Sequence, residues 1–343
     1  LGTTERVSIS STGLEAHGSS TNPSVSSSGR YVVFQSDASD LVDGDSGGHS
    51  DIFLHERETG ETVRVSVSSA GIAGDGDSWS PTISADGSAV AFRSDADNLV
   101  PGLAGSYTDV YLRDRTTGLT ELISVAIDGG RGNGSSGSPS ISAEGRAVAF
   151  SSDASNLVSG DGNGFEDVFV RDRTGGSTER VSVPQCSAEG NSYSWAPAIS
   201  ADGRTVAYVS MASNLVGCDD NANHDVYLYD RAGGTTERVS YSTAGVGGND
   251  ASVVPSISAA GRVIAFSSWS DNLASSDENG AEDIFVRDRD GEYPYRVSGQ
   301  VRHANGLAVS GVAVRTDSGA LTTTGSKGDY AFSLEVDRTY TLT

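Results

Sequence analysis

The chain has 343 residues, and its 46 acidic and 23 basic side chains give a formal net charge of −23. A surface this negative repels nucleic acid, so we expect no nucleic-acid partner. Hydrophobic residues make up 36% of the chain, but they never form the run of about 18 residues that a membrane helix needs. The 43 glycines and 8 prolines leave the composition outside the low-complexity range, so we expect a folded protein without a membrane span.

The sequence starts at Leu1, with neither an initiator methionine nor a charged and then apolar leader. Such a start is expected of the mature product of a secreted precursor. We therefore expect a secreted, extracellular or cell-surface location.

From residue 3 onward the sequence repeats every 58 residues, and five units run to residue 292. Each unit contains four short alternating or β-branched runs, separated by turn residues and without helical periodicity. In the third unit these runs cover residues 139–142, 146–152, 167–173 and 178–183. Four antiparallel strands in each unit predict an all-β fold, a five-bladed β-propeller over residues 1–292.

Two segments of each unit carry a family resemblance. In the fourth unit they read Ser-Ala-Asp-Gly-Arg-Thr-Val-Ala-Tyr at residues 200–208 and Asp-Val-Tyr-Leu-Tyr-Asp-Arg at residues 225–231. This pattern resembles the TolB-type, WD-like propeller repeat. The resemblance implies the fold, but it implies function only loosely, because such repeats occur in periplasmic scaffolds, peptidase-associated domains and many other secreted proteins.

The long loop between the second and third strands carries oxygen side chains at its first, third and seventh positions. This spacing resembles a calcium loop, although calcium prefers about 6–8 oxygen ligands and the loops offer fewer. The alternative is that these side chains form Asx turns and cap the third strand. The candidate Ca2+ ligands are Asp45, Asp51, Asp161, Asn163, Asp167, Asp219, Asn221, Asp225, Asp277, Asn279 and Asp283.

The two cysteines both fall in long connections of the fourth unit. Cys186 precedes its first strand and Cys218 lies in its second long loop. Antiparallel strand order places both connections at the same end of the sheet, so we expect a Cys186–Cys218 disulfide and an oxidising compartment.

A set of arginines recurs at the turn after the third strand of every unit. We expect these side chains to form cross-strand ion pairs with Glu5, Glu121, Glu179 or Glu237. The set consists of Arg57, Arg115, Arg173, Arg231 and Arg289.

The period breaks at residue 293. The remaining residues, 293–343, contain Gly-x-Val, Thr-Thr-Thr and Gly-x-Tyr-x-Phe steps. They resemble the carboxypeptidase regulatory-like, transthyretin-like β-sandwich. Members of that family continue through further strands, so we expect a small, incomplete sandwich with an open edge.

The strand count does not balance, because the segment that forms the fourth strand occurs six times for five units. We expect residues 3–9 to close the last blade by pairing with residues 283–289, which leaves residues 297–301 to begin the sandwich. The competing arrangement puts residues 295–298 in the fifth blade and frees the N-terminal strand to enter the sandwich of another molecule.

The predicted inner strands carry no acidic residue, whereas glycoside hydrolysis requires two carboxylates. We therefore expect a non-enzymatic scaffold or adhesion protein, such as the repeating subunit of an extracellular filament or surface assembly, that self-associates through its C-terminal module. The alternative is a glycan-binding module or a hydrolase that uses the long-loop face, where Trp79, Trp195 and Trp269 lie.

Overall fold

The computed structural model describes residues 2–289 apart from 46–47, 104, 186–188, 218–220, 222 and 276, and beyond them the strands at 295–300, 313–315, 321–323 and 329–334. The chain divides into two compact units, Leu1–Arg287 and Asp288–Thr343. Every regular element of the described residues is a β-strand. Among these residues there is no helix that would be able to cross a membrane.

The first unit consists of five consecutive antiparallel sheets, four with four strands and the fifth with three described strands. The all-β prediction is therefore confirmed, with one sheet for each 58-residue repeat. In chain order the strands are β1 (Ser20–Val25), β2 (Tyr31–Ser36), β3 (Asp51–Glu56), β4 (Glu61–Arg64), β5 (Ser78–Ile83), β6 (Ala89–Ser94), β7 (Asp109–Asp114), β8 (Leu119–Leu122), β9 (Ser136–Ile141), β10 (Ala147–Ser152), β11 (Asp167–Asp172), β12 (Ser177–Arg180), β13 (Ser194–Ile199), β14 (Thr205–Ser210), β15 (Asp225–Asp230), β16 (Thr235–Arg238), β17 (Ser252–Ile257), β18 (Val263–Ser268) and β19 (Asp283–Asp288).

The first strand of each sheet begins about three residues earlier than the sequence predicts. In β9 the strand starts at Ser136, although Pro139 lacks the amide hydrogen that a strand interior requires. Ser138, just before this proline, has a φ of 50°, and the pairing of β9 with β10 shifts register there. A β-bulge therefore carries the strand past the proline. The same positive φ recurs before the corresponding proline of every sheet, at Asn22, Ser80, Ala196 and Val254.

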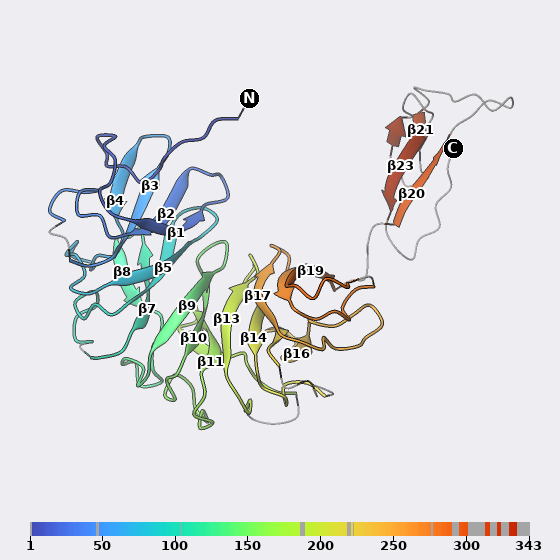
Figure 1. The fold of residues 1–343 in the computed structure, drawn as a ribbon. Helices are drawn as coiled ribbons and strands as arrows, with labels where there is room; N and C mark the ends of the chain where they lie inside the picture. Colours follow the sequence, from blue (N-terminus) through green and yellow to red (C-terminus); the bar gives the residue numbers. More distant parts are fainter. Residues whose placement is uncertain are drawn as a thin grey trace. The chain divides into compact units, whose positions relative to one another are not determined.

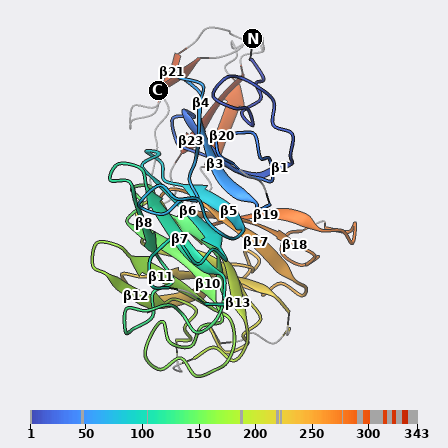
Figure 2. The same ribbon diagram turned by 90° about the vertical axis from the view of Figure 1, so that its left-hand side faces the viewer.

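The sheets pack face to face in chain order, as blades do in a propeller (Figures 1 and 2). The first strands β1, β5, β9, β13 and β17 contact one another in sequence, which makes them the inner strands. Within each sheet one aromatic ring of the second strand stacks on one of the third, and the ring centroids of Phe150 and Phe169 are 5.8 Å apart. Burial of these rings and of the β-branched residues around them supplies the stabilising hydrophobic area.

Backbone hydrogen bonds connect the inner turns of successive sheets. The amide of Ser27 donates to Ala85 O, and the series continues from Ala85 to Ala143, from Ala143 to Ala201 and from Ala201 to Ala259, each at 2.9 Å. The bond from Ala259 to Ser27 that would close the ring is not formed in the described part of the chain. The arrangement is thus propeller-like but open, with the first and fifth sheets at its two ends (Figure 1).

The repeated arginines connect neighbouring sheets. Arg173 Nε donates to Glu121 Oε1 at 2.7 Å, and equivalent pairs join Arg57 to Glu5 and Arg231 to Glu179. The expected glutamates are the partners of these three arginines, but the pairs join neighbouring sheets and do not cross one hairpin as expected. Arg115 differs, because Val63 replaces the glutamate, and its guanidinium lies 4.2 Å from the ring centroid of Tyr31 instead.

The described part of the second unit contains four strands, which pair two by two. β20 (Tyr295–Gln300) is antiparallel to β23 (Asp329–Leu334), and β21 (Ala313–Arg315) is antiparallel to β22 (Leu321–Thr323). Most of residues 293–343 lie outside the described residues, so the sandwich stays a prediction.

The proposed pairing of residues 3–9 with residues 283–289 also stays a prediction. In the structure β19 pairs with β18, and Glu5 contacts Arg57 of the first sheet.

Candidate functional site

In the third repeat the predicted calcium ligands surround an arginine from the fourth strand. Arg180 Nη1 lies 3.1 Å from Asp161 Oδ1 and 3.2 Å from both Asp167 Oδ2 and Glu189 Oε1. The hydroxyl of Ser182 donates to the other carboxylate oxygen of Asp167 at 2.5 Å. The side chains of Asp161 and Asp167 are 4% and 0% exposed. This set of an arginine, a loop aspartate, a strand aspartate and a serine is called the arginine site below.

The first repeat has the same arginine site. Arg64 Nη2 lies 2.9 Å from Asp45 Oδ1, and its Nε lies 3.5 Å from Asp51 Oδ2. Ser66 Oγ donates to Asp51 Oδ1 at 2.6 Å. The position expected for a metal therefore holds a guanidinium, and a calcium ion would have to displace it.

The fourth repeat keeps the strand part of the arginine site. Arg238 Nη2 lies 2.6 Å from Asp225 Oδ1, to which Ser240 Oγ also donates at 2.6 Å. Its loop aspartate, Asp219, is outside the described residues.

The second repeat also pairs its buried strand aspartate with an arginine, but this arginine comes from a different position. Leu122 occupies the arginine position and Leu103 the loop position. Arg131, from the connection to the next sheet, instead pairs with Asp109 and lies 2.9 Å from Asp97 Oδ1. A cation beside the buried strand aspartate is therefore common to all four complete sheets.

Burial dominates the electrostatics of these carboxyl groups. Desolvation raises the pKa of Asp51, Asp109 and Asp167 above the ordinary aspartate value, although serine and arginine partners oppose the shift. The pKa of Asp161 is raised to about 6, first by burial and then by the charge of Asp167.

The asparagines of the loops form Asx turns, as the alternative interpretation expects. Asn163 Oδ1 accepts from the amide of Phe165 at 3.0 Å, and Asn221 Oδ1 accepts from the amide of Asn223 at 3.0 Å. The Asn163 amide group also donates to Asp167 Oδ2 at 2.9 Å. These bonds hold the loop against the start of the third strand.

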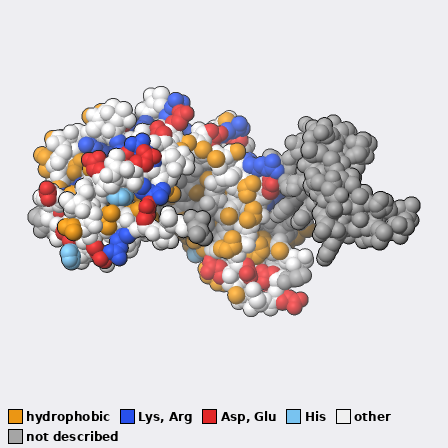
Figure 3. Space-filling model, turned by 90° about the horizontal axis from the view of Figure 1, so that it is seen from above, with side chains coloured by type: hydrophobic (Ala, Val, Ile, Leu, Met, Phe, Trp, Pro, Cys, Tyr) orange, Lys and Arg blue, Asp and Glu red, His pale blue; other side chains and the backbone are white. Residues whose placement is uncertain are grey.

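The fifth sheet differs from the others because its third strand, β19, is exposed. Ile284 and Val286 are 73% and 52% exposed. Their counterparts in the first sheet, Ile52 and Leu54, are 0% and 2% exposed. Figure 3 shows hydrophobic side chains gathered on one exposed surface of the first unit, with acidic side chains beside them.

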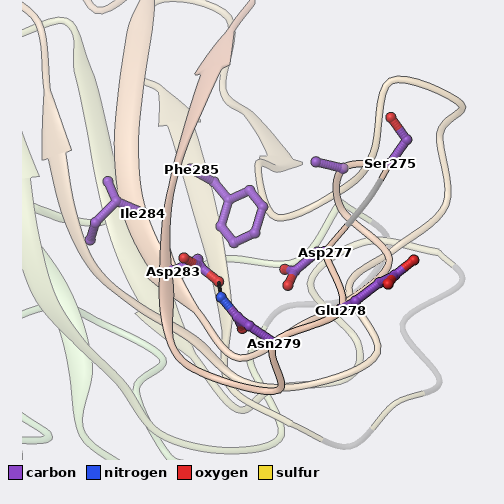
Figure 4. Close-up of a pocket in the computed structure, with 8 residues that line it drawn as sticks. Ser275, Asp277, Glu278, Asn279, Asp283, Ile284 and Phe285 are labelled. Atoms are coloured by element: carbon purple, nitrogen blue, oxygen red, sulfur yellow. Dashed lines mark hydrogen bonds between the residues drawn. The ribbon is translucent and has the colours of Figure 1, made fainter.

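The acidic residues of the fifth repeat line a hollow of ≈ 650 Å³ beside β19 (Figure 4). Asp277, Asp283, Ile284 and Phe285 are among the residues that line it. Asn279 Nδ2 donates to Asp283 Oδ2 at 3.0 Å. Among the described residues no arginine pairs with Asp277 or Asp283, so this repeat has the acids of an arginine site without the cation.

The structure leaves the metal and disulfide predictions open. No group of three or more His, Cys, Asp or Glu side chains is arranged to hold a metal ion among the described residues. Both Cys186 and Cys218 fall outside the described residues, and so does Asp219.

Sequence reasoning missed the arginines themselves. Arg64, Arg180 and Arg238 occupy one column of the repeat, followed each time by Val-Ser, and Arg6 and Arg296 share that column. This shared Arg-Val-Ser step is the sequence signal that pairs each arginine with the aspartates of its own repeat.

The comparisons with known proteins concern the fold. No family model matches the sequence, and no curated protein matches it. Among solved structures, TolB from Acinetobacter baumannii has a TM-score of 0.46 at 18% identity, covering 81% of this chain and 54% of that one. The putative TolB from Agrobacterium tumefaciens has a TM-score of 0.47 at 15% identity, covering 92% and 89%.

The tricorn protease has a TM-score of 0.47 at 12% identity over 96% of this chain and 31% of its own. This chain thus spans about half the length of the Acinetobacter TolB and about a third of the tricorn protease.

Proposed function

We propose that this protein is a non-enzymatic scaffold or adhesion module of a secreted or cell-surface assembly. The observation that carries the proposal is the exposed third strand of the fifth sheet, with Ile284 and Val286 at its surface. A β-strand with a free edge and exposed apolar side chains is a template for pairing with another chain. Such pairing relies on backbone hydrogen bonds and suits a structural assembly.

The state of the repeated acids supports the same proposal. Asp51, Asp109, Asp167 and Asp225 are buried and engaged by arginine and serine. Groups used in this way in the four complete sheets stabilise the blade and are withheld from substrate chemistry. Self-association through the C-terminal module, calcium binding by the long loops and the Cys186–Cys218 disulfide stay predictions.

Sedimentation velocity of the full chain over a wide range of concentrations tests the scaffold role, with negative-stain microscopy of the same samples. We expect the mean sedimentation coefficient to rise with concentration and the images to contain elongated particles. A single monomeric species at every concentration would contradict the proposal.

A second candidate function, glycan binding, has its own supporting observation. Trp269, Tyr107 and Tyr193 are 44%, 45% and 46% exposed, and exposed aromatic rings stack on sugars. A glycan array probed with and without a chelator tests this candidate. Binding that disappears in Trp269→Ala supports it, and a blank array rules against it.

A further inference from the structure

One face of the fifth sheet is exposed. In each of the other four sheets, the corresponding face packs against the next sheet in the chain. In the first sheet, Ile52 and Leu54 pack in one core cluster with Val90 and Phe92 of the second sheet. The residues in the position of Ile284 are fully buried in the four other sheets: Ile52, Val110, Val168 and Val226. The fifth sheet therefore exposes the face that the other sheets bury against the next sheet in the chain.

The first sheet exposes the complementary surface. Val25 of β1 is 58% exposed, whereas its counterparts Ile83 and Ile199 are both 7% exposed. The two ends of the row of sheets therefore match as two halves of an internal junction.

The N-terminal segment already lies on the first sheet as a preceding fourth strand would. Thr62 Oγ1 donates to Ile9 O at 2.5 Å, as Thr120 Oγ1 donates to Val67 O at 2.5 Å in the next junction. The Arg57–Glu5 ion pair likewise repeats the pairs at later junctions. Residues 5–8 read Glu-Arg-Val-Ser, the same as residues 179–182 and 237–240 of complete sheets.

The charges of the two ends are also complementary. The side chain of Arg6 is 56% exposed, with the exposed Glu15 as its ion-pair partner, whereas the side chain of Arg180 in the same column is 7% exposed among three carboxylates. Asp277 and Asp283 have the acids of an arginine site but no arginine among the described residues. One end thus presents an exposed arginine, and the other presents two aspartates that no described arginine pairs with.

We propose that residues 5–8 of a second copy of this chain form the fourth strand of the fifth sheet, with Arg6 in the arginine site of Asp277 and Asp283. This inference rests on the proposed scaffold function and identifies its joint. A second copy is favoured over closure by the same chain because Val25 and Ile284 are both exposed in the structure, whereas closure within one chain would bury them. A head-to-tail joint of this kind produces open chains of molecules.

The internal sheets fix the register of the joint. In the fourth sheet Leu228 lies opposite Glu237 and Tyr227 lies opposite Arg238. By the same repeat, Glu5 of the second copy lies opposite Val286 and Arg6 lies opposite Phe285. Ser8 then donates to Asp283, as Ser240 donates to Asp225.

Two full-length variants separate the two sides of the joint. Arg6→Glu removes the donor side and leaves the acceptor, and Ile284→Glu removes the acceptor side and leaves the donor. Each alone is expected to associate about tenfold or more weakly than the wild type, because each puts an unpaired charge into the joint. Mixed together, they are expected to form a one-to-one dimer and nothing larger. Arg146→Glu and Ile72→Glu, at exposed positions away from the joint, serve as matched controls.

Sedimentation velocity distinguishes the outcomes, with thermal melts to confirm that all variants fold. A dimer only in the mixture supports the joint. If both variants assemble as the wild type does, the joint is wrong while the scaffold function stands. If the mixture of otherwise monomeric variants gives no dimer, the joint is overturned as well. A wild type that stays monomeric contradicts both the joint and the scaffold function.

Discussion

The arginine site buries two carboxylates and one guanidinium where a long loop meets the end of a β-sheet. Isolated charges there would lose several kcal/mol of hydration, and they persist because each is paired and hydrogen-bonded. Asp167 accepts from Ser182, Asn163 and Arg180 at once. The site therefore attaches the fourth strand and the long loop to the start of the third strand. Its hydrogen bonds are directional, whereas contacts between apolar side chains would not fix this geometry.

Removing the cation tests this role. We expect Arg180→Met to lower the free energy of unfolding by about 3–5 kcal/mol, because Asp161 and Asp167 stay buried without a countercharge. Arg146→Met is the control, since Arg146 pairs at the surface with Glu144, and we expect a change within about 0.5 kcal/mol. Urea unfolding measures both. Equal effects would contradict a structural role for the site.

The raised pKa of Asp161, about 6 against an ordinary value of 3.8, predicts a pH dependence of stability. Below about pH 4 the group is protonated in the folded and unfolded states, and between about pH 4 and 6 only the folded state keeps the proton. The stability that this group contributes is therefore present at low pH and is lost as the pH rises through about 6. Relative to Asp161→Asn, the wild type should lose stability over this interval.

Asp230 provides a control of opposite sign. A hydrogen bond from Arg204 lowers its pKa to about 2, so its contribution is present above about pH 4 and is lost as the pH falls towards 2. Urea unfolding of Asp161→Asn and Asp230→Asn at several pH values measures both. Parallel curves for the wild type and Asp161→Asn would contradict the assignment.

The residue-scale chemistry was only partly predictable. The 1, 3, 7 spacing of oxygens correctly identified Asp161, Asn163 and Asp167 as neighbours in one loop. Spacing of acceptors alone does not distinguish a metal from a guanidinium, because both are cations that bind carboxylates. Only the three-dimensional pairing of the second long loop with the fourth strand identifies Arg180 as the cation.

The β-bulge in the inner strand requires a strained backbone conformation at one residue of each repeat. Its residue with positive φ precedes a proline in all five sheets, and the left-handed region costs a residue with a Cβ about 1–2 kcal/mol. In the fifth sheet the position holds Val254, a β-branched residue with a φ of 52°. The first sheet holds Asn22, a residue that tolerates this region.

We therefore expect Val254→Asn to raise the free energy of unfolding by about 1 kcal/mol, because asparagine relieves the backbone strain. Val246→Asn is the control, since Val246 is similarly exposed, at 55% against 71%, and does not have a positive φ. Thermal unfolding of both variants at low concentration measures the difference. A gain in the control alone would contradict the strain argument.

The connection between sheets depends on close backbone contact at Gly134. A Cβ there would lie 2.7–2.9 Å from backbone atoms of Asp153 and Ala154, which cannot move aside. We expect Gly134→Ala to destabilise the protein by about 1–3 kcal/mol. Gly217→Ala, with no atom within 4 Å of its Cβ, should change stability by less than about 0.5 kcal/mol. Urea unfolding compares them, and equal losses would refute the close-contact argument.

At the scale of elements the sequence predicted the period, the four strands of a repeat and their antiparallel order. These follow from alternation and turn residues, which act within one repeat. It misplaced the start of the inner strand, because a proline usually ends a strand and the bulge at Ser138 was not visible in the pattern. The sequence also did not identify which segment forms the fourth strand of the fifth sheet, because six candidate segments compete for five positions.

At the scale of the whole molecule, similar junctions recur between successive sheets, so the row of blades is extendable. Each junction repeats a turn hydrogen bond, an apolar face and, where the glutamate is present, an Arg–Glu pair. The first sheet exposes one face of this junction, and the fifth sheet exposes the other face. A molecule built this way has complementary ends, and its assembly state follows from whether those ends meet within one chain or between two.

The measurement that tests this account most directly is cross-linking between Glu5→Cys and Val286→Cys, each in a full-length background with Cys186 and Cys218 replaced by serine. When the two single variants are mixed and treated with a short bismaleimide, we predict a covalent dimer, because the register places these positions opposite each other. Arg146→Cys mixed with Val286→Cys, with Arg146 on the third sheet and away from both ends, should give little product. A double variant carries both Glu5→Cys and Val286→Cys in one chain. If the mixture of single variants stays monomeric while the double variant links within one chain, the two ends close on themselves and the account is contradicted.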